Sequence, residues 1–515
     1  MSNVHSILRS LIIYAICIPL AVFLGYVLSD PLDRGSFVTV AVVLSVLCAP
    51  VLIRFHYPLM LLSWNMIAVL FFLPGQPQLF FATIAISFTI SFTQRILNKE
   101  IRSISVPALT WPILAIAVVV AVTGALTGGF GVRALGGQVY GGKRYFLIFL
   151  GILGFFALTA HRIPRGRAGL YLALFFLGGL TYLIGDLFPV LFSSFPFLFY
   201  VFPPTSLTGD FEFGITRFGG LAQASAGVFA YMMARYGIRG ILDAGKPWRL
   251  LAFVIFSGLS LFGGFRSVLI GIFGAFVVQF FLEGLHRTRL LPMMVLMVTM
   301  IGASVVPFTA KLPFTVQRAL AFLPVVPVDP VVRLSAESSI DWRLNMWKAL
   351  LPQVPQYLLL GKGLAMSQED YGLSQESMTT DARALTEDQW GAALAGDYHN
   401  GPLSLVIPFG IWGVIAWVWF LAAGFWVLYR NYRYGDHALK SINTFLLASV
   451  IVRTLMFWFL VGGFYQDMIY YMGVIGLNVS LNGGVAPRVT APALPESQAT
   501  QLPTILRRQR PVFSR

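Results

Sequence analysis

The chain has few charged residues and almost no cysteine. Charged residues make up 11% of its 515 residues, where about 25% is usual for a soluble domain. Its two cysteines, Cys17 and Cys48, exclude a disulfide-stapled scaffold. Instead, 57% of the residues are hydrophobic and the mean hydropathy is +0.77, which excludes an intrinsically disordered chain. The hydrophobic residues come in runs of about 18–25, the length that crosses a bilayer, so a soluble enzyme is excluded as well.

These runs predict an all-α polytopic membrane protein with about 14 transmembrane helices, in the range 12–14. Arg9 precedes the first run without a small-residue cleavage site, so we expect a retained helix rather than a signal peptide. The predicted spans are 11–28, 36–53, 57–73, 77–93, 107–126, 145–160, 168–190, 218–234, 250–264, 267–284, 290–307, 402–428, 441–462 and 464–482. The predicted organisation is transmembrane helices 1–11 (1–307), a large periplasmic loop (308–400), transmembrane helices 12–14 (401–482) and a flexible cytoplasmic tail (483–515).

The positive charges indicate how the chain is oriented. Lysines and arginines concentrate in alternate connections and in the tail, whereas most acids on the other side lie in the loop 308–400. By the positive-inside rule, we expect both termini in the cytoplasm. The formal net charge of +15 is then mainly a topology signal. A nucleic-acid partner is not expected, because the basic residues are scattered over short connections rather than gathered on one face.

One histidine stands apart from the other five. His399 falls where the large loop re-enters the membrane, whereas the others fall in predicted cytoplasmic connections: His5, His56, His161, His286 and His437. A neutral imidazole accepts a proton near pH 7, and the neighbouring Asp397 could orient the ring. A lone histidine is also often structural, and its position alone leaves both interpretations open. A His/Cys metal site is not expected, because the outward segments offer no second histidine and no cysteine.

Three arginines are predicted at the outer membrane face. Arg266 lies in a tight turn between two spans, Arg217 lies at the same level, and Arg343 stands near the start of a predicted loop helix. The planar guanidinium fork suits phosphate oxygens and stays charged at any physiological pH. If the three side chains converge, they would neutralise a diphosphate without a metal ion. If each stands alone, it would simply snorkel to lipid headgroups.

The loop is predicted to contain an amphipathic helix that begins at Ser338–Asp341. One face of that helix carries Trp342, Met346, Ala349 and Leu350. We expect the helix to lie on the membrane surface with its tryptophans in the interface.

A fourth arginine, Arg453, falls inside the thirteenth predicted span. Charged residues at such depth are costly and are usually paired, and Asp467 and Asp186 are the available partners. We interpret Arg453 as a buried, paired structural charge rather than a catalytic group.

Three stretches, in this order and spacing, resemble the O-antigen ligase and O-antigen polymerase family of bacterial membrane glycosyltransferases. The first is Phe265–Ser267 before an apolar span, and the second is Asp341–Trp347 leading to Gly361–Gly363. The third is Tyr398–Leu403 followed by Phe409–Gly413. The resemblance covers about 210–430, and the first 200 residues match only in being hydrophobic.

The resemblance implies a C-type glycosyltransferase-like fold and a glycan donor carried on polyprenyl (undecaprenyl) diphosphate, used at the periplasmic face of the inner membrane. It implies His399 as the catalytic base beside Asp397, and Arg266, Arg343 and Arg217 as the diphosphate-binding residues. The implied reaction is independent of metals and cofactors, and a single displacement would invert the anomeric centre. The expected partners are the donor, a lipid or glycan acceptor, and membrane lipid.

Several functions share these motifs. A lipopolysaccharide ligase, a polysaccharide polymerase and a protein O-glycosylating enzyme are not separated by the sequence, and we favour ligation or polymerisation. From a different class, a lipid-linked oligosaccharide flippase has a similar number of helices, but it would not need a large outer loop that carries the only outward histidine.

Overall fold

The computed structural model of the protein describes residues 34–71, 76–100, 103–128, 142–191, 197–204, 217–323, 325–364 and 396–488, residues 73, 214 and 215, and scattered positions between 11 and 26. Over these residues the chain is almost entirely helical, with an isolated β bridge between Val69 and Gln78. The predicted tail beyond residue 488, the first span in part, and loop residues 365–395 lie outside this description.

Seven helices in the described part of the chain are long and apolar enough to cross a membrane. Three shorter apolar helices accompany them, at Arg144–Thr159, Pro247–Gly263 and Arg266–Leu282. The predicted all-α membrane architecture is therefore confirmed. The count of fourteen spans, the periplasmic side of the loop and the cytoplasmic side of the termini stay predictions.

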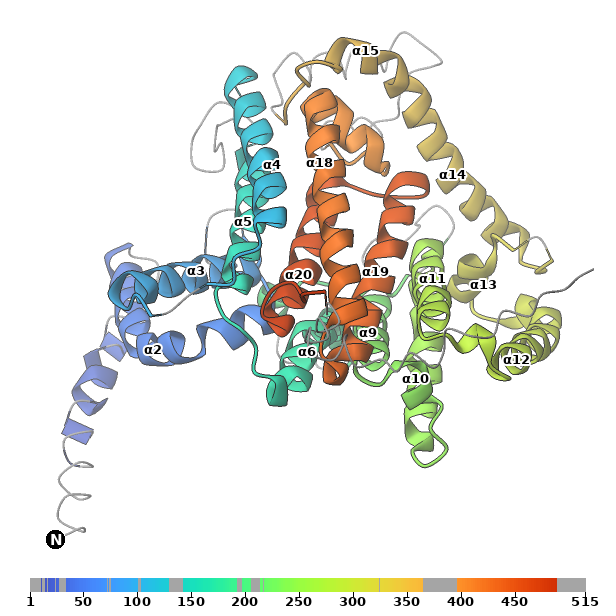
Figure 1. Ribbon diagram of the computed structural model, residues 1–515, viewed down its shortest axis with the longest axis horizontal. Coiled ribbons are helices and arrows are strands. Elements are labelled where there is room, and N and C mark those ends of the chain that lie inside the picture. The colour runs from blue at the N-terminus through green and yellow to red at the C-terminus, as the bar shows by residue number, and fades with distance from the viewer. Residues whose placement is uncertain are drawn as a thin grey trace, which may run out of the picture.

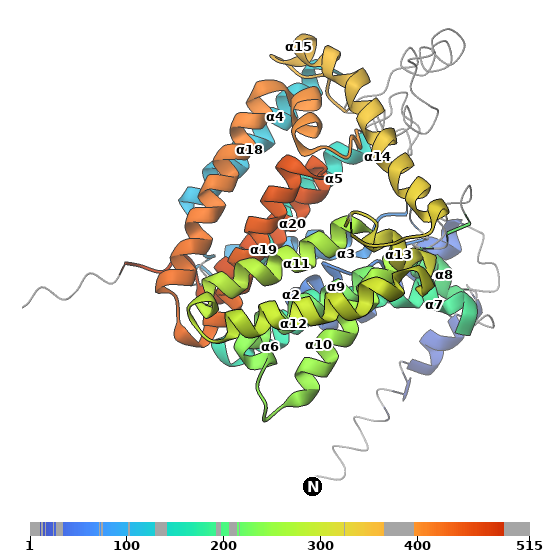
Figure 2. The same ribbon diagram turned by 90° about the vertical axis from the view of Figure 1, so that its right-hand side faces the viewer.

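The helices outside the loop are α2 (Arg34–Ser63), α3 (Leu79–Leu97), α4 (Pro107–Leu126), α5 (Gly142–Thr159), α6 (Ala168–Leu177), α7 (Tyr182–Leu191), α8 (Phe197–Val201), α9 (Gly219–Ile241), α10 (Pro247–Leu259), α11 (Arg266–Leu282), α12 (Leu290–Val305), α18 (Gly401–Tyr434), α19 (Lys440–Phe459) and α20 (Phe464–Asn482). Within the loop are α13 (Phe314–Leu320), α14 (Pro330–Leu350) and α15 (Val354–Tyr357). In Figures 1 and 2, α14 runs obliquely from α13 to α15, which lies near the ends of α4 and α18.

One predicted pair of spans is wrong. The runs 36–53 and 57–73 are not two helices, because α2 continues through Arg54 and ends at Ser63, with Pro50 and Pro58 inside it. His56, expected in a connection, therefore lies within α2. The apolar chain after Ser63 leaves the helix, and its backbone groups bond elsewhere: Val69 N donates to Val201 O at 2.8 Å and Leu79 N to Ala68 O at 2.7 Å. Hydrophobic runs are non-helical at such depth where protein supplies the backbone partners.

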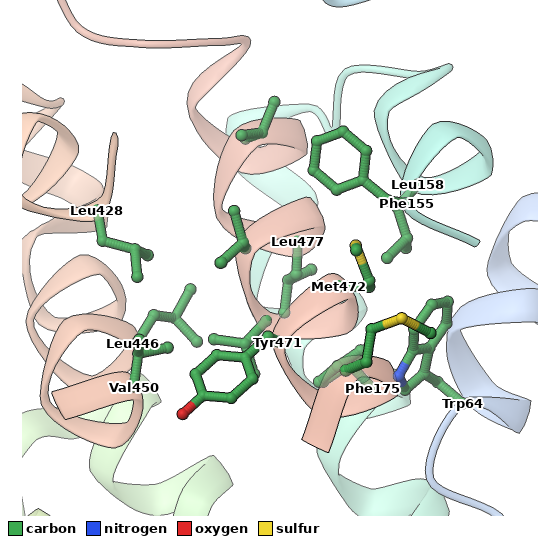
Figure 3. Close-up of a cluster of buried hydrophobic side chains, with 14 of the residues drawn as sticks. Trp64, Phe155, Leu158, Phe175, Leu428, Leu446, Val450, Tyr471, Met472 and Leu477 are labelled. Atoms are coloured by element: carbon green, nitrogen blue, oxygen red, sulfur yellow. The ribbon is translucent and has the colours of Figure 1, made fainter. Parts of the chain in front are cut away.

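The centre of the bundle is α20, which packs along α5 and against α18 and α19. Its middle turns are buried without interruption, which fits a helix surrounded by other helices rather than by lipid. In Figure 3, Tyr471, Met472 and Leu477 of α20 meet Trp64, which directly follows α2, and side chains from α5, α6, α18 and α19. By contrast, α12 has no buried residue and presents apolar side chains all round, as a lipid-facing helix does.

A buried asparagine network fixes the three C-terminal helices to one another. Asn431 Nδ2 donates to Asn478 Oδ1 at 2.7 Å, and Asn478 Nδ2 donates to Asn443 Oδ1 at 2.9 Å. Asn443 Nδ2 donates to Asn482 Oδ1 at 3.0 Å. Buried amides that satisfy one another in this way specify a single arrangement of helices. The network therefore holds α18, α19 and α20 in register below the site described next.

The loop helix is longer than predicted. It begins at Pro330 rather than at Ser338–Asp341, with Asp329 as N-cap: Asp329 Oδ1 accepts a hydrogen bond from Val331 N at 2.9 Å. The predicted apolar face is confirmed, because Met346 and Leu350 are buried with Trp342 and Ala349 packed beside them. That face packs on Tyr398, Leu403 and Ile407, so α14 holds the re-entry point of the loop.

The Gly361–Gly363 stretch forms backbone hydrogen bonds to α18 at a point where that helix is interrupted. At Gly410 the helix has φ +62, and Pro408 precedes it. Lys362 N donates to Ile407 O at 2.7 Å and Gly363 N donates to Pro408 O at 2.9 Å, so the stretch satisfies carbonyls that the break leaves open. Gly361 has φ +73, and a Cβ added there would overlap the carbonyl oxygen of Pro408.

The change Gly361→Ala should therefore lower stability by at least about 1–2 kcal/mol from the left-handed backbone alone. The measurement is the midpoint of thermal unfolding in detergent. Gly258→Ala is the matched control, because a Cβ at this helical position meets nothing within 4 Å. An equal unfolding midpoint for the two variants would contradict the conclusion that Gly361–Gly363 stabilises the break in α18.

Candidate active site

The structure gives each residue of the Tyr398–Gly401 motif a distinct role. Tyr398 is buried and its carbonyl oxygen accepts a hydrogen bond from Trp347 Nε1 at 2.8 Å. Asn400 is the N-cap of α18, and its Oδ1 accepts from Leu403 N at 3.0 Å. A side chain on Gly401 would overlap the carbonyl oxygen of Phe457, so only glycine lets α18 begin this close to α19.

His399 has a left-handed backbone, with φ +46. This conformation is costly for a residue with a side chain and is typical of functional positions that the surrounding structure enforces. Here the buried Tyr398 on one side and the Asn400 cap on the other enforce it. The Trp342 ring packs edge-on against the imidazole, with ring centroids 5.5 Å apart.

Asp397 lies beside the imidazole, with its Oδ1 3.8 Å from His399 Nδ1. That distance is longer than a hydrogen bond, so the interaction is electrostatic. Burial lowers the pKa of His399 below its ordinary value near 6.5; Asp397 opposes that shift and Arg343 adds to it. The net direction is downward, so the imidazole is neutral near pH 7 and able to accept a proton.

The three predicted arginines converge. Burial lowers the pKa of Arg266, and the charges of Arg343 and Arg217 lower it further. Arg343 in turn interacts electrostatically with Arg217 and Asp397. Burial, followed by the charge of Arg217, lowers the pKa of Arg343, and Asp397 opposes the shift. Three like charges held together in a partly buried place repel one another, which is the arrangement that favours binding of a multiply charged anion.

Backbone and aromatic contacts hold these arginines in place. Arg266 is the first residue of α11, and its Nη2 donates to Ala336 O of α14 at 3.1 Å. The Arg217 guanidinium lies over the Phe265 ring at 5.8 Å from the centroid. Arg266 and Arg217 are thus held from different elements, and Arg343 comes from a third, α14.

A buried arginine that the sequence analysis missed joins the same elements. Arg318 of α13 donates from Nη1 to Gly264 O at 3.0 Å, from Nε to Ser335 Oγ at 2.9 Å and from Nη2 to Ser339 Oγ at 2.7 Å. It therefore ties the turn before Arg266 to the helix that carries Arg343. Its only sequence signal was an arginine within a short apolar helix.

The site opens into a cavity of about 950 Å³. Asp397 and His399 line it, and so do Arg144 of α5, Arg453 of α19 and Ser267 of α11. Arg144 was also missed; its charge interacts with Asp397, Tyr398 and Tyr465. The cavity runs down between α9, α11, α19 and α20, where the lining becomes apolar.

Arg453 is paired, and its partner is Asp467. The two form an ion pair through Arg453 Nε and Asp467 Oδ1. Asp186, the other expected partner, instead accepts hydrogen bonds from the backbone N–H groups of Gly220 at 2.6 Å and Leu221 at 3.3 Å.

The described residues contain no group of three or more His, Cys, Asp and Glu side chains that could hold a metal ion. Positive charge in the site comes from guanidinium groups, which bind anions rather than cations.

Together the fold and the site define a polytopic helical membrane protein with a cation-lined cavity. Residues 251–418 match a family model described as O-antigen ligase, so the resemblance predicted from the sequence is confirmed over this segment. The match supports a glycosyltransferase activity of the O-antigen ligase or polymerase type. It includes Arg266, Arg343, Asp397 and His399 and begins after Arg217. No curated protein matches the chain.

Proposed function

We propose that the protein is a metal-independent, inverting glycosyltransferase that moves a glycan from a polyprenyl diphosphate carrier to an acceptor hydroxyl at the periplasmic face of the bacterial inner membrane. The observation that carries this proposal is the gathering of one neutral imidazole and three guanidinium groups, far apart in the chain, beside one cavity.

The arginines act on the leaving group. As the bond between the anomeric carbon and the carrier phosphate breaks, negative charge grows on the diphosphate oxygens. Arg266, Arg343 and Arg217 are already charged and already held in place, so they stabilise that charge without reorganisation. This supplies the charge neutralisation for which other phosphate-processing enzymes use a metal ion.

His399 acts on the acceptor. Its neutral imidazole takes the proton from the acceptor hydroxyl as the oxygen attacks the anomeric carbon, and such base catalysis typically contributes about 10²–10⁴-fold. One displacement with attack opposite the leaving diphosphate inverts the configuration at that carbon.

The test uses purified protein in proteoliposomes with a polyprenyl diphosphate-linked glycan, EDTA, and two acceptors: lipid A–core, and a second molecule of the lipid-linked glycan. Transfer with release of polyprenyl diphosphate is expected, and the acceptor used separates ligase from polymerase. If the lipid-linked glycan crosses the bilayer unchanged and no transfer product forms, the protein is a flippase and the proposal fails.

The pH dependence of transfer should follow His399. Because the base must be neutral, activity should rise with pH through the His399 pKa and be level above it, with the midpoint below about 6.5. Asp397 raises that pKa, so Asp397→Asn should move the midpoint to lower pH, whereas Arg343→Gln should move it higher. The measurement is the rate at saturating donor between pH 4.5 and 8.5. Midpoints that do not move in either variant would exclude His399 as the titrating base.

A further inference from the structure

Arg453 sits in a place where an arginine is unusual. It lies six residues before the end of α19, about 9 Å down the helix, and it lines the cavity that His399 also lines. Its side chain is 33% exposed, whereas that of Asp467 is 0% exposed. The cavity therefore reaches the arginine and not its partner.

Asp467, which does not line the cavity, holds the Arg453 side chain, which does. Arg453 Nε donates to Asp467 Oδ1, and Asp467 Oδ2 accepts from Gly463 N at 2.9 Å. Among the described residues, this is the one hydrogen bond that Arg453 makes; its guanidinium also lies over the Tyr470 ring, 5.6 Å from the centroid, and the residue lines the cavity. Asp467 thus fixes the plane of the guanidinium and compensates its charge.

Stability alone does not explain such a pair. Apolar residues of similar volume are often as stable as a buried ion pair or more so, because both charges lose their hydration. What apolar residues would not supply is a preorganised pair of N–H donors in the cavity wall. That geometry suits the oxygens of an oxyanion.

Arg453 is separate from the three arginines proposed to bind the diphosphate. Arg217, Arg266 and Arg343 act on one another and not on Arg453, whose charge acts on Asp467, Tyr470 and Tyr471. Those three arginines also do not line the described cavity, whereas His399 does. A base that serves both substrates must lie between them, so the acceptor approaches His399 from the cavity.

We propose that Arg453, oriented by Asp467, binds an anionic substituent of the acceptor glycan, a phosphate or a carboxylate, and so sets acceptor specificity. Close packing of Gly401 on Phe457 places the start of α18 about one turn, or 6 Å, above Arg453. An acceptor held at Arg453 therefore extends its hydroxyl toward His399. The inference rests on the proposed function, since it assumes transfer to a glycan acceptor.

The experiment measures transfer by wild type and Arg453→Lys with three forms of lipid A–core: native, dephosphorylated, and carboxyl-methylated. Lysine keeps the charge and loses the fork, so KM for native acceptor should rise about 10–100-fold, with KM for the donor unchanged. Removing the phosphates or the carboxylates should abolish the difference between the enzymes, and the form that does so identifies the bound group. Arg433→Lys, at an exposed position on α18, is the control and should match wild type.

Equal losses on every acceptor form, or a raised KM for the donor, would overturn the proposal. If Arg453→Lys does not fold, the double variant Arg453→Met with Asp467→Leu removes both charges and should show the same acceptor-dependent loss. Absence of transfer by wild type both to lipid A–core and to a second molecule of the lipid-linked glycan would instead refute the proposed function itself, which separates the two failures.

Discussion

Replacing His399 by asparagine should leave the protein folded and inserted but lower glycan transfer by at least about 10²-fold, because the variant lacks the base that deprotonates the acceptor. Asparagine is chosen because it tolerates the left-handed backbone that residue 399 adopts. His399→Ala should also abolish transfer, with some loss of stability from the same backbone conformation. Transfer is measured with saturating donor and acceptor, so that binding does not limit the rate.

The control for this change is His437→Asn, at an exposed histidine next to α19 on the far side of the bundle from His399. It should transfer at the wild-type rate. Binding of polyprenyl diphosphate should persist in His399→Asn, since the proposed phosphate contacts are intact. A variant that keeps its thermal stability and still transfers at more than a tenth of the wild-type rate would refute the base assignment.

The second large effect is expected at Arg266. Arg266→Lys keeps the charge, but it loses both the planar fork and the hydrogen bond from Nη2 to Ala336 O. A charge-assisted bidentate contact contributes about 1.5–3 kcal/mol, so kcat/KM for the donor should fall about 10–100-fold. Arg343→Lys should behave alike.

Arg333→Lys is the matched control, because Arg333 is exposed on the same loop helix as Arg343. It should have no effect on kcat/KM. If Arg266→Lys equals wild type, a point charge suffices at that position and the bidentate diphosphate role is wrong.

Much of the fold follows from the length of the apolar runs, but the ends of elements do not. The run 57–73 is apolar enough for a span, yet the chain leaves the helix at Ser63 because partners such as Val201 supply its backbone hydrogen bonds. Likewise α14 begins eight residues before Ser338, since the signal at its true start is a single capping aspartate, Asp329, followed by proline. Distant packing therefore decides where α2 ends, whereas the start of α14 is marked only by this short local cap.

For the candidate site, the sequence revealed the residues that stand at membrane edges. His399 was singled out by its place where the large loop re-enters, Arg266 by its place in an expected turn and Arg343 by its place near the start of the expected loop helix. It did not reveal Arg318 and Arg144, because each meets its partners only in three dimensions. The pairing of Arg453 with Asp467 was foreseeable, since a charge so deep needs a partner. The sequence did not indicate that Arg453 lines a cavity.

The most direct measurement is a cryo-EM map of the protein in a lipid nanodisc with polyprenyl diphosphate bound. The account predicts that the two phosphates contact Arg266 and Arg343, with the His399 imidazole facing the terminal phosphate across the mouth of the cavity. A diphosphate bound instead at the opposite end of the bundle, beside Arg430 and Arg433, would contradict it.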